Sequence, residues 1–278
     1  MERATQAIID LNAIASNVAA VRNIIGPGRD LMAIVKADAY GHGAFEVSRT
    51  ALKSGATCLG VALPEEGEKL RIQGIDVPLL VLGLIHPEEA SKVVRARLEQ
   101  TICTLEAAAA LDQAARASSQ KLNVHMKVDT GMGRIGVDPS DAVDFARRIS
   151  RFKNLRLKGI FSHLPCADDP DKSFTRGQIT LFGDLLREIE ASGIKIPQKH
   201  LANSAGILNF PESHLDLVRP GIMLYGLRPT PHMGHGVALK PAMTLKTKIA
   251  YLKQVPPGTP ISYGHTFSCG NQMLVATL

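Results

Sequence analysis

The sequence has few cysteines, and none of them has the spacing that metal sites and disulfide scaffolds require. Its four cysteines, Cys58, Cys103, Cys166 and Cys269, are scattered along 278 residues without a C-x-x-C pair. This distribution argues against a structural zinc site and against a disulfide framework. We therefore predict that the chain binds no metal and functions in a reducing compartment.

Long apolar runs and blocks of one charge are also missing. No apolar stretch approaches the length of about 20 residues that spans a membrane. The chain has 32 basic and 26 acidic residues, which are well mixed, so no basic block is available to follow a nucleic-acid backbone. The first residues, MERATQAIIDL, lack the pattern of a secretory signal. We therefore expect a cytoplasmic protein without membrane or nucleic-acid partners.

The apolar residues that are present predict an α/β fold. Apolar side chains make up 45% of the chain, and short apolar runs alternate with amphipathic ones. Continuous apolar strands followed by helices favour a parallel sheet covered on both faces, and eight such units fit a (β/α)8 TIM barrel. A doubly wound open sheet is the alternative, although the G-x-G-x-x-G turn that it normally carries is absent. The strand-like runs are 31–36, 57–62, 77–83, 99–104, 122–130, 155–164, 199–208 and 215–220.

The pattern changes near residue 231. From there to residue 278 the sequence has period-two alternation, several Thr residues, and the turn signals PPG and CGN. We predict a barrel domain over residues 1–230 and a β-rich domain over residues 231–278. The chain ends within the apolar run MLVATL, and a β fragment this short is small for an independent core. We therefore expect the β-rich domain to be incomplete.

Two strand ends carry side chains suited to chemistry, because a barrel places its active site where its strands end. In AIVKADAYGHGA (33–44), Lys36 ends the first strand and Tyr40 follows four residues later. A desolvated lysine can attack a carbonyl; a lysine that simply leaves the strand for solvent is the alternative. In KVDTGMGRIG (127–136), Arg134 follows glycines that permit close approach to a carboxylate, or it is a solvated arginine in an ordinary turn.

Later strand ends offer an anion site and two further candidates. In ANSAG, Ser204 begins a short helix, and Gly221 follows the eighth strand. Barrels often bind phosphate at these two places, while a serine that only caps the helix is the alternative. His163 in FSHL is either a catalytic group or a satisfied polar residue. In the β-rich domain, Tyr263 of SYGHTF lies beside Gly264 and His265, and the default interpretation is a turn aromatic.

In this order, these stretches and VRPGIMLYG (218–226) resemble alanine racemases, which are fold-type III enzymes that use pyridoxal 5'-phosphate (PLP). The match extends from residue 33 to residue 267. The resemblance implies that Lys36 binds PLP covalently and that Arg219 is the partner of the pyridine nitrogen. The remaining implied cofactor contacts are Tyr40, His163, Asn203, Ser204 and the backbone of Gly221 and Ile222.

The resemblance also implies a reaction, the interconversion of L- and D-alanine by two bases in a homodimer. Racemisation needs a base on each face of the substrate, and the implied pair is Lys36 and Tyr263 of the partner subunit. Arg134 is implied to bind the substrate carboxylate, and Lys127 matches a lysine that is often carbamylated. The D-alanine product would supply peptidoglycan. The alternatives are a broader amino-acid (serine) racemase, or a non-catalytic PLP-binding barrel, which usually lacks a β domain.

Overall fold

The computed structural model describes residues 4–231, 233 and 236–278. The chain divides into two compact units, of which the larger contains residues 10–242 and the smaller combines the N-terminal segment with residues 243–278. β1 (Gln6–Ile9) and β10 (Met243–Lys246) form an antiparallel pair, which is why the N-terminal segment belongs to the smaller unit. The division drawn from the sequence, between residues 230 and 231, did not include this pairing and otherwise stays a prediction.

The strands of the larger unit form one parallel sheet. Their bounds are β2 (Asp30–Ile34), β3 (Cys58–Val61), β4 (Leu79–Val81), β5 (Glu99–Ile102), β6 (Leu122–Lys127), β7 (Leu155–Phe161), β8 (Gln198–His200) and β9 (Leu217–Val218). Among the described residues the sheet has eight strands in the order β8-β7-β6-β5-β4-β3-β2-β9. Its two edges approach each other, because Asp216 N donates to Lys199 O at 3.1 Å and Arg219 N donates to Ala202 O at 3.0 Å. The predicted TIM-like barrel is confirmed, and the open doubly wound alternative is wrong.

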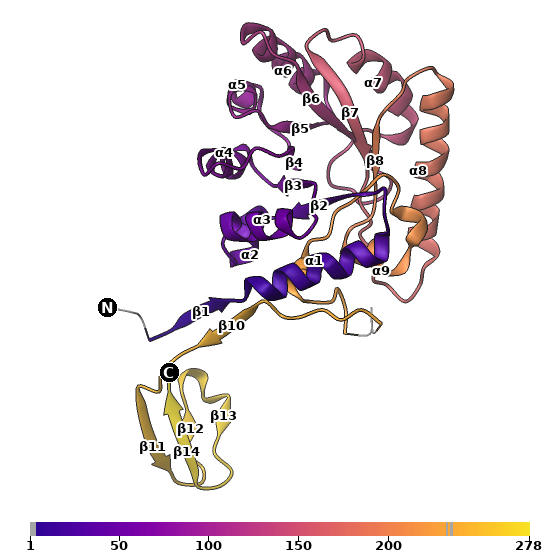
Figure 1. Ribbon diagram of the computed structural model, residues 1–278. Helices are drawn as coiled ribbons and strands as arrows, with labels where there is room; N and C mark the ends of the chain where they lie inside the picture. Colours follow the sequence, from indigo (N-terminus) through magenta and orange to yellow (C-terminus); the bar gives the residue numbers. More distant parts are fainter. Residues whose placement is uncertain (1–3, 232, 234–235) are drawn as a thin grey trace. The chain divides into compact units, whose positions relative to one another are not determined.

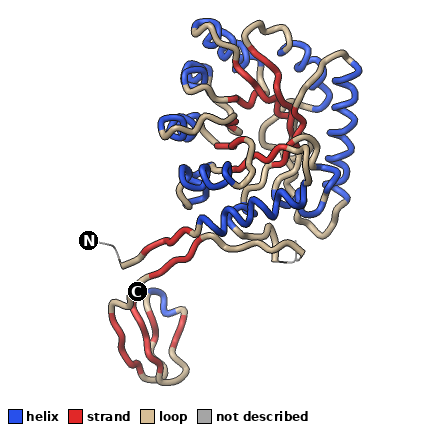
Figure 2. The backbone as a smooth tube through the Cα atoms, viewed as in Figure 1, coloured by secondary structure: helices blue, strands red, loops and turns tan. Residues whose placement is uncertain are grey.

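Helices follow most of these strands and surround the sheet, as the blue and red segments of Figure 2 show. The long α1 begins at Asp10, whose carboxylate accepts N–H bonds from Asn12 and Ala13, and such a cap contributes about 1 kcal/mol. The bounds are α1 (Leu11–Ile25), α2 (Lys36–Gly41), α3 (Ala44–Lys53), α4 (Pro64–Ile72), α5 (Ala90–Arg95), α6 (Leu105–Ala117), α7 (Ala142–Ile149), α8 (Ser173–Ala191) and α9 (Ser204–Asn209), labelled in Figure 1. Short 3-10 helices lie at Pro87–Glu89, Pro139–Asp141, Pro211–Ser213 and Ile222–Tyr225.

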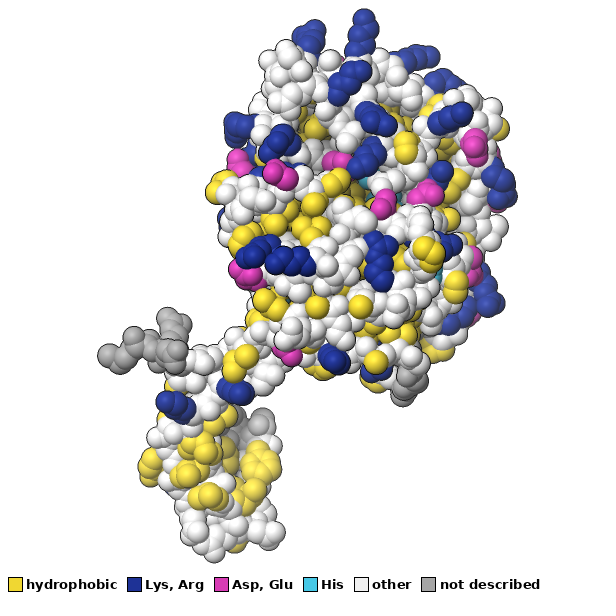
Figure 3. Space-filling view, in the orientation of Figure 1, with side chains coloured by type: hydrophobic (Ala, Val, Ile, Leu, Met, Phe, Trp, Pro, Cys, Tyr) yellow, Lys and Arg dark blue, Asp and Glu magenta, His cyan; other side chains and the backbone are white. Residues whose placement is uncertain are grey.

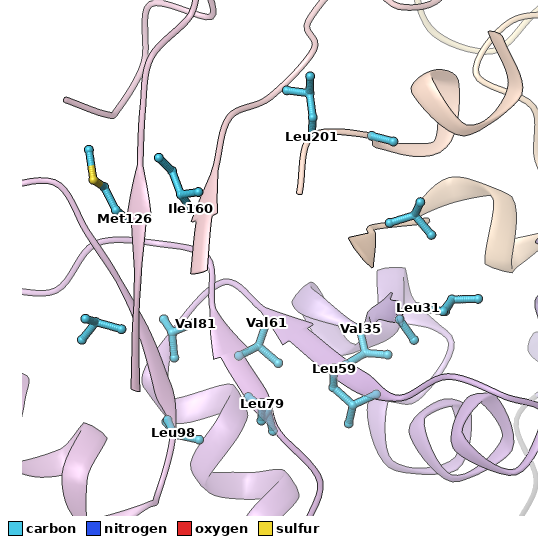
Figure 4. Close-up of a cluster of buried hydrophobic side chains, with 14 of the residues drawn as sticks. Leu31, Val35, Leu59, Val61, Leu79, Val81, Leu98, Met126, Ile160 and Leu201 are labelled. Carbon is cyan, nitrogen blue, oxygen red and sulfur yellow. The ribbon is translucent and has the colours of Figure 1, made fainter. Parts of the chain in front are cut away.

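The main core lies between the strands and the surrounding helices. Alternate strand residues such as Leu59 and Val61 of β3, and Leu79 and Val81 of β4, belong to it and are fully buried (Figure 4). Complete burial of one such side chain contributes about 1.5–3 kcal/mol relative to exposure. Since the opposite faces of β2, β3 and β4 are buried inside the barrel, these three strands read as nearly continuous apolar runs.

The interior of the barrel has an apolar side and a polar side. Side chains from β2, β3, β4 and β9 form an apolar cluster that includes Met32, Cys58 and Leu80. The buried polar side chains come instead from β5, β6 and β8 and from the residue after β9; they include Glu99, Thr101, His125, Lys127, His200 and Arg219.

The smaller unit is built from short antiparallel strands, as the sequence predicted. β11 (Tyr251–Val255) pairs with β14 (Met273–Thr277), and β12 (Pro260–Ile261) pairs with β13 (Phe267–Ser268). Several apolar side chains of this unit are exposed, including Tyr251, Leu252 and Leu274, and Figure 3 shows apolar side chains on the face in view. The unit therefore presents apolar surface to its surroundings.

The described part of the chain has neither a membrane-spanning helix nor a cluster of metal ligands. No helix among residues 4–231, 233 and 236–278 is long and apolar enough to cross a membrane. Over the same residues, no group of three or more His, Cys, Asp or Glu side chains is placed to hold a metal ion. The four cysteines, all within the described ranges, are free thiols.

Candidate active site

A cavity of about 470 Å³ lies where the barrel strands end, and it collects the predicted site residues of the larger unit. Its walls come from the segments that follow β2, β6, β7, β8 and β9. The predicted residues that line it are Lys36, Tyr40, Lys127, Arg134, His163, Asn203, Ser204, Arg219, Gly221 and Ile222. Residues that are far apart in the sequence thus share one cavity, as the barrel hypothesis requires.

Lys36 enters the cavity from an unusual backbone turn. The four residues after it, from Ala37 to Tyr40, have φ values of 51° to 54°. A left-handed conformation costs a non-glycine residue about 1–2 kcal/mol, so such a run persists only where its surroundings enforce it. The turn brings Tyr40 back beside the lysine, with the Lys36 Nζ atom 5.9 Å from the centre of the Tyr40 ring.

Two carboxylates hold this turn in place. Glu66 Oε1 accepts the Ala37 N–H at 2.7 Å, and its Oε2 atom accepts the Ala62 N–H at 2.7 Å. Asp38 Oδ1 accepts the Ala44 N–H at 2.7 Å, which joins the turn to the start of α3. Our sequence analysis did not identify either carboxylate as part of the site. The one available signal was the PEE start of α4, which is typical of a helix N-terminus.

Tyr40, Ser204 and Gly221 form a small polar cradle at one end of the cavity. Ser204 Oγ accepts the Gly221 N–H at 2.9 Å and lies 3.4 Å from Met223 N, and its own O–H proton can still be donated to an anion. A Cβ atom on Gly221 would lie 3.0 Å from the Tyr40 hydroxyl. Glycine therefore leaves room between two hydroxyl groups. Ile222 begins the adjacent 3-10 helix.

Asn203, and not Ser204, caps helix α9. The Asn203 Oδ1 atom accepts the Gly206 N–H at 2.9 Å, and its Nδ2 group donates to Leu164 O at 2.8 Å. The alternative interpretation of Ser204 as a simple helix cap is therefore wrong. Both ends of the Asn203 amide are engaged in the protein, so Asn203 lines the cavity while it shapes the start of α9.

Arg219 is buried and held by three acceptors. Its Nη1 group donates to His200 Nδ1 at 2.9 Å, and its Nη2 group donates to Ser162 O at 2.7 Å and to Leu201 O at 3.0 Å. His163 Nδ1 lies 3.5 Å from the same Nη2 atom. Burial lowers the pKa of Arg219 to about 9, which still leaves the guanidinium protonated at neutral pH. Burial and the Arg219 charge lower the pKa of His163 to about 3, so this imidazole is neutral.

Lys127 is a second buried cation beside Arg219. Its side chain is almost completely enclosed, and Nζ donates to Val128 O at 2.9 Å. Both cations contact the Phe161 ring, whose centre lies 5.5 Å from Lys127 Nζ and 5.2 Å from the Arg219 guanidinium. Burial, with a smaller contribution from Arg219, lowers the pKa of Lys127 to about 8. A substantial neutral fraction of this amine is therefore present near physiological pH.

The loop that carries Arg134 is organised by Asp129. The Asp129 carboxylate accepts N–H bonds of 2.8 to 3.1 Å from Gly131, Met132, Gly133 and Arg134. Burial alone would raise the pKa of Asp129, but these backbone donors lower it below its usual value. The Arg134 side chain is exposed at the cavity wall. Our sequence analysis missed Asp129, although an aspartate just before a glycine-rich turn is a recognisable signal.

We expect Asp129→Ala to lower the free energy of unfolding by about 1–3 kcal/mol, because four backbone donors lose their acceptor. Asp138→Ala is the matched control, since among the described contacts the Asp138 carboxylate accepts bonds only from Ser140. Urea unfolding of both variants measures the difference. Equal losses of stability would show that Asp129 does not organise the loop.

Tyr263 is the predicted site residue that belongs to the smaller unit. It begins the 3-10 helix Tyr263–His265, and its side chain is 98% exposed. Ser262, Gly264 and His265 have positive φ values of 60°, 72° and 47° in this turn. The phenol therefore has no close neighbours among the described residues of its own unit.

The sequence comparisons agree with this geometry. Residues 9–229 match the family description "Alanine racemase, N-terminal domain", and residues 242–278 match "Alanine racemase, C-terminal domain". This chain belongs to the alanine racemase family. It is 44% identical to the alanine racemase of Halothermothrix orenii over 276 residues, which cover 99% of this chain and 73% of that protein. The alanine racemase of Desulforamulus reducens is 42% identical, with 100% and 76% of the two chains covered.

Solved alanine racemases share the fold. The crystal structure of alanine racemase from D-cycloserine-producing Streptomyces lavendulae matches with a TM-score of 0.93 and 35% identity, covering 99% of this chain and 73% of that one. The family resemblance inferred from the sequence is thus confirmed. The chain is accordingly a racemase, an enzyme of the isomerase class.

Proposed function

We propose that this racemase interconverts L- and D-alanine with PLP as its cofactor. The observation that carries the proposal is the convergence of an amine, a buried guanidinium and a two-hydroxyl cradle on one cavity. These groups suit the aldehyde, the ring nitrogen and the phosphate of PLP respectively. When bound, PLP supplies an electron sink for the bond to the α-proton.

The residues that would hold the cofactor follow from their chemistry. Lys36 would bind the aldehyde carbon through its amine. Tyr40, Ser204 and the backbone at Gly221 and Ile222 would bind the phosphate, for which the absent Cβ of Gly221 leaves space. Asn203 would support this cradle by fixing the start of α9. His163 would pack against the ring, on the wall that it shares with Arg219.

Arg219 would donate a hydrogen bond to the ring nitrogen. A guanidinium has only donors, so the nitrogen beside it would have to accept and would stay unprotonated. An unprotonated ring withdraws electrons less strongly, which would favour racemisation over transamination. Arg134 would bind the substrate carboxylate with its planar group.

Two bases would move the α-proton. Lys36 would remove or return it on one face of the substrate, and Tyr263 of the partner subunit would act on the other face. The chain would therefore function as a homodimer with composite sites. We also propose that its D-alanine supplies peptidoglycan synthesis in the cytoplasm. The direct test is an assay with each enantiomer of alanine and of serine, in which comparable rates on serine would favour a broader specificity.

Mixing two inactive variants tests the composite site. We expect Lys36→Ala and Tyr263→Phe to be inactive alone and to recover up to about a quarter of wild-type activity after subunit exchange. About half of the dimers would be mixed, and each mixed dimer would have one intact site of two. The measurement is alanine racemisation before and after exchange.

The control for this experiment mixes Lys36→Ala with the Lys36→Ala, Tyr263→Phe double variant, which should recover nothing. Subunit exchange is followed independently with two affinity tags. Exchange without recovery in the first mixture would mean that both bases act from one chain.

Lys127 is the proposed site of carbamylation. Its neutral amine would take up carbon dioxide and release one proton, and the resulting carbamate would position Arg134. Because the pKa of Lys127 is lowered to about 8, we expect more carbamate near pH 8 than at pH 6. The check is a carbamate NMR signal from isotope-labelled bicarbonate, which should be lost in Lys127→Met and retained in Lys53→Met. A signal that persists in Lys127→Met would contradict the assignment.

A further inference from the structure

A chain of buried hydrogen bonds crosses the barrel interior beneath the candidate site. Arg219 Nη1 lies 2.9 Å from His200 Nδ1, His200 Nε2 lies 3.0 Å from His125 Nδ1, and His125 Nε2 lies 3.1 Å from Glu99 Oε2. All four side chains are buried, and the two imidazoles are completely enclosed. The bonds run from the end of β9 through β8 and β6 to β5.

The two end residues of this hydrogen-bond chain line different cavities. Arg219 lines the cavity of the candidate active site. Glu99 lines a second cavity, of about 350 Å³, which also contacts the residues that precede β4 and β6. There the other carboxylate oxygen of Glu99, Oε1, accepts from Lys158 Nζ at 2.6 Å and from Asn123 Nδ2 at 2.9 Å.

Donor and acceptor roles are determined along the whole chain. Arg219 can only donate, so His200 Nδ1 must accept, and a neutral His200 then carries its proton on Nε2. That proton is donated to His125 Nδ1, and His125 in turn carries its proton on Nε2 and donates it to Glu99. Burial lowers the pKa of His125 and His200. Glu99 has its pKa lowered to about 2, since the bonds from His125 and Lys158 outweigh the effect of its burial.

The fold leaves space for the side chains of this hydrogen-bond chain. A Cβ atom on Gly159 in β7 would lie 2.1 Å from His125 Nδ1, and the β6–β7 register shifts between Val124 and His125. The His200 ring stacks on Phe161, with 4.6 Å between ring centres and 9° between planes. Buried ionic networks can often be replaced by apolar residues without loss of stability. Stability alone therefore gives no reason for this arrangement.

We propose that Glu99 is a positioning residue for Arg219, acting through the tautomers of His125 and His200. As the terminal acceptor, Glu99 makes each imidazole donate away from Arg219, so that Arg219 always meets an unprotonated nitrogen. The guanidinium is thereby held in one orientation by His200 on one side and by backbone carbonyls on the other. The consequence for catalysis rests on the proposed contact between Arg219 and the ring nitrogen of PLP.

Glu99→Gln should reverse the donor-to-acceptor direction of these buried hydrogen bonds. Lys158 and Asn123 both donate to Oε1, so the amide oxygen of a glutamine would occupy that position and its NH2 group would face His125 Nε2. His125 would then carry its proton on Nδ1 and donate to His200 Nε2, and His200 would present an N–H group to Arg219. The N–H group of His200 and the Arg219 guanidinium, both donors, would then face each other.

Histidine NMR on the isotope-labelled full chain without cofactor tests this directly, because it reports which ring nitrogen is protonated. Signals are identified with His125→Asn and His200→Asn. We expect both residues to be Nε2-protonated in the wild type and Nδ1-protonated in Glu99→Gln. Asn123→Ala is the control, since it removes a bond to Oε1 and should leave both tautomers unchanged.

A wild-type His200 that carries its proton on Nδ1 would overturn the proposal without any variant, even if Glu99→Gln does not fold. Unchanged tautomers in a folded Glu99→Gln chain would also overturn it. In the PLP-loaded enzyme, we expect Glu99→Gln to raise transamination relative to racemisation several-fold, with a smaller change in the KM for alanine. An unchanged ratio with reversed tautomers would refute the positioning role. Failure of Lys36 to bind PLP would refute the proposed function and leave the tautomer result standing.

Discussion

Lys36→Ala is expected to lower kcat for alanine racemisation by about 10²–10⁴-fold, which is the typical contribution of a well-placed acid–base group. The variant loses the amine that would bind the cofactor and act as one of the two bases. Lys36 follows β2 at the cavity wall and is not part of the buried core, so we expect the melting temperature to change little. Racemisation of each enantiomer and thermal unfolding are measured on the same preparation.

The matched control is Lys53→Ala, which removes an exposed lysine at the end of α3 and should retain wild-type activity. PLP should still bind Lys36→Ala without a covalent bond, because the Tyr40–Ser204–Gly221 cradle is intact. A Lys36→Ala variant with more than about a tenth of wild-type kcat would exclude the lysine as an essential base.

Arg219→Glu should have the second large effect. It should change both the free energy of unfolding and the ratio of transamination to racemisation. The change removes the donor for two backbone carbonyls and places a carboxylate in a buried site. Disruption of such a buried charged site costs about 3–5 kcal/mol. With PLP bound, a glutamate there would favour a protonated ring nitrogen, so racemisation should slow and transamination should take a larger share of turnover.

Chemical unfolding and product analysis measure the two effects separately. Arg219→Lys is the comparison, because lysine keeps the positive charge and loses the planar set of donors. We expect it to retain the wild-type product ratio more closely than Arg219→Glu. Equal ratios of transamination to racemisation in wild type and Arg219→Glu would contradict the proposed role of Arg219.

The barrel could be predicted from the sequence because its signals are local. Each of the eight strand-like runs overlaps one of the strands β2 to β9, and the signal is strongest in β2, β3 and β4, where both faces are buried and the residues are apolar. The pairing of β1 with β10 could not be predicted in the same way. Gln6–Ile9 is four residues long, and its partner lies at the other end of the chain, so neither segment carries information about the other.

The cavity residues were predictable because they lie at or just after the ends of strands. The carboxylates that fix the backbone around them were not predictable. Glu66 and Asp129 act through bonds from their side chains to backbone N–H groups, which no periodicity records. One sequence pattern, which we overlooked, indicates the buried hydrogen-bond chain. In LNVHMK (122–127), polar Asn123, His125 and Lys127 alternate with apolar residues, a period-two pattern that indicates a polar barrel interior beside β6.

Borohydride reduction of the PLP-loaded chain, followed by peptide mapping, tests the central claim most directly. The claim is that the cavity at the strand ends holds PLP through Lys36, and reduction makes that bond permanent. Our account predicts one pyridoxyl group, on the peptide that contains Lys36, and none on Lys127 in the same cavity. A label on Lys127 or any other lysine, or no label on a chain that binds PLP, would contradict it.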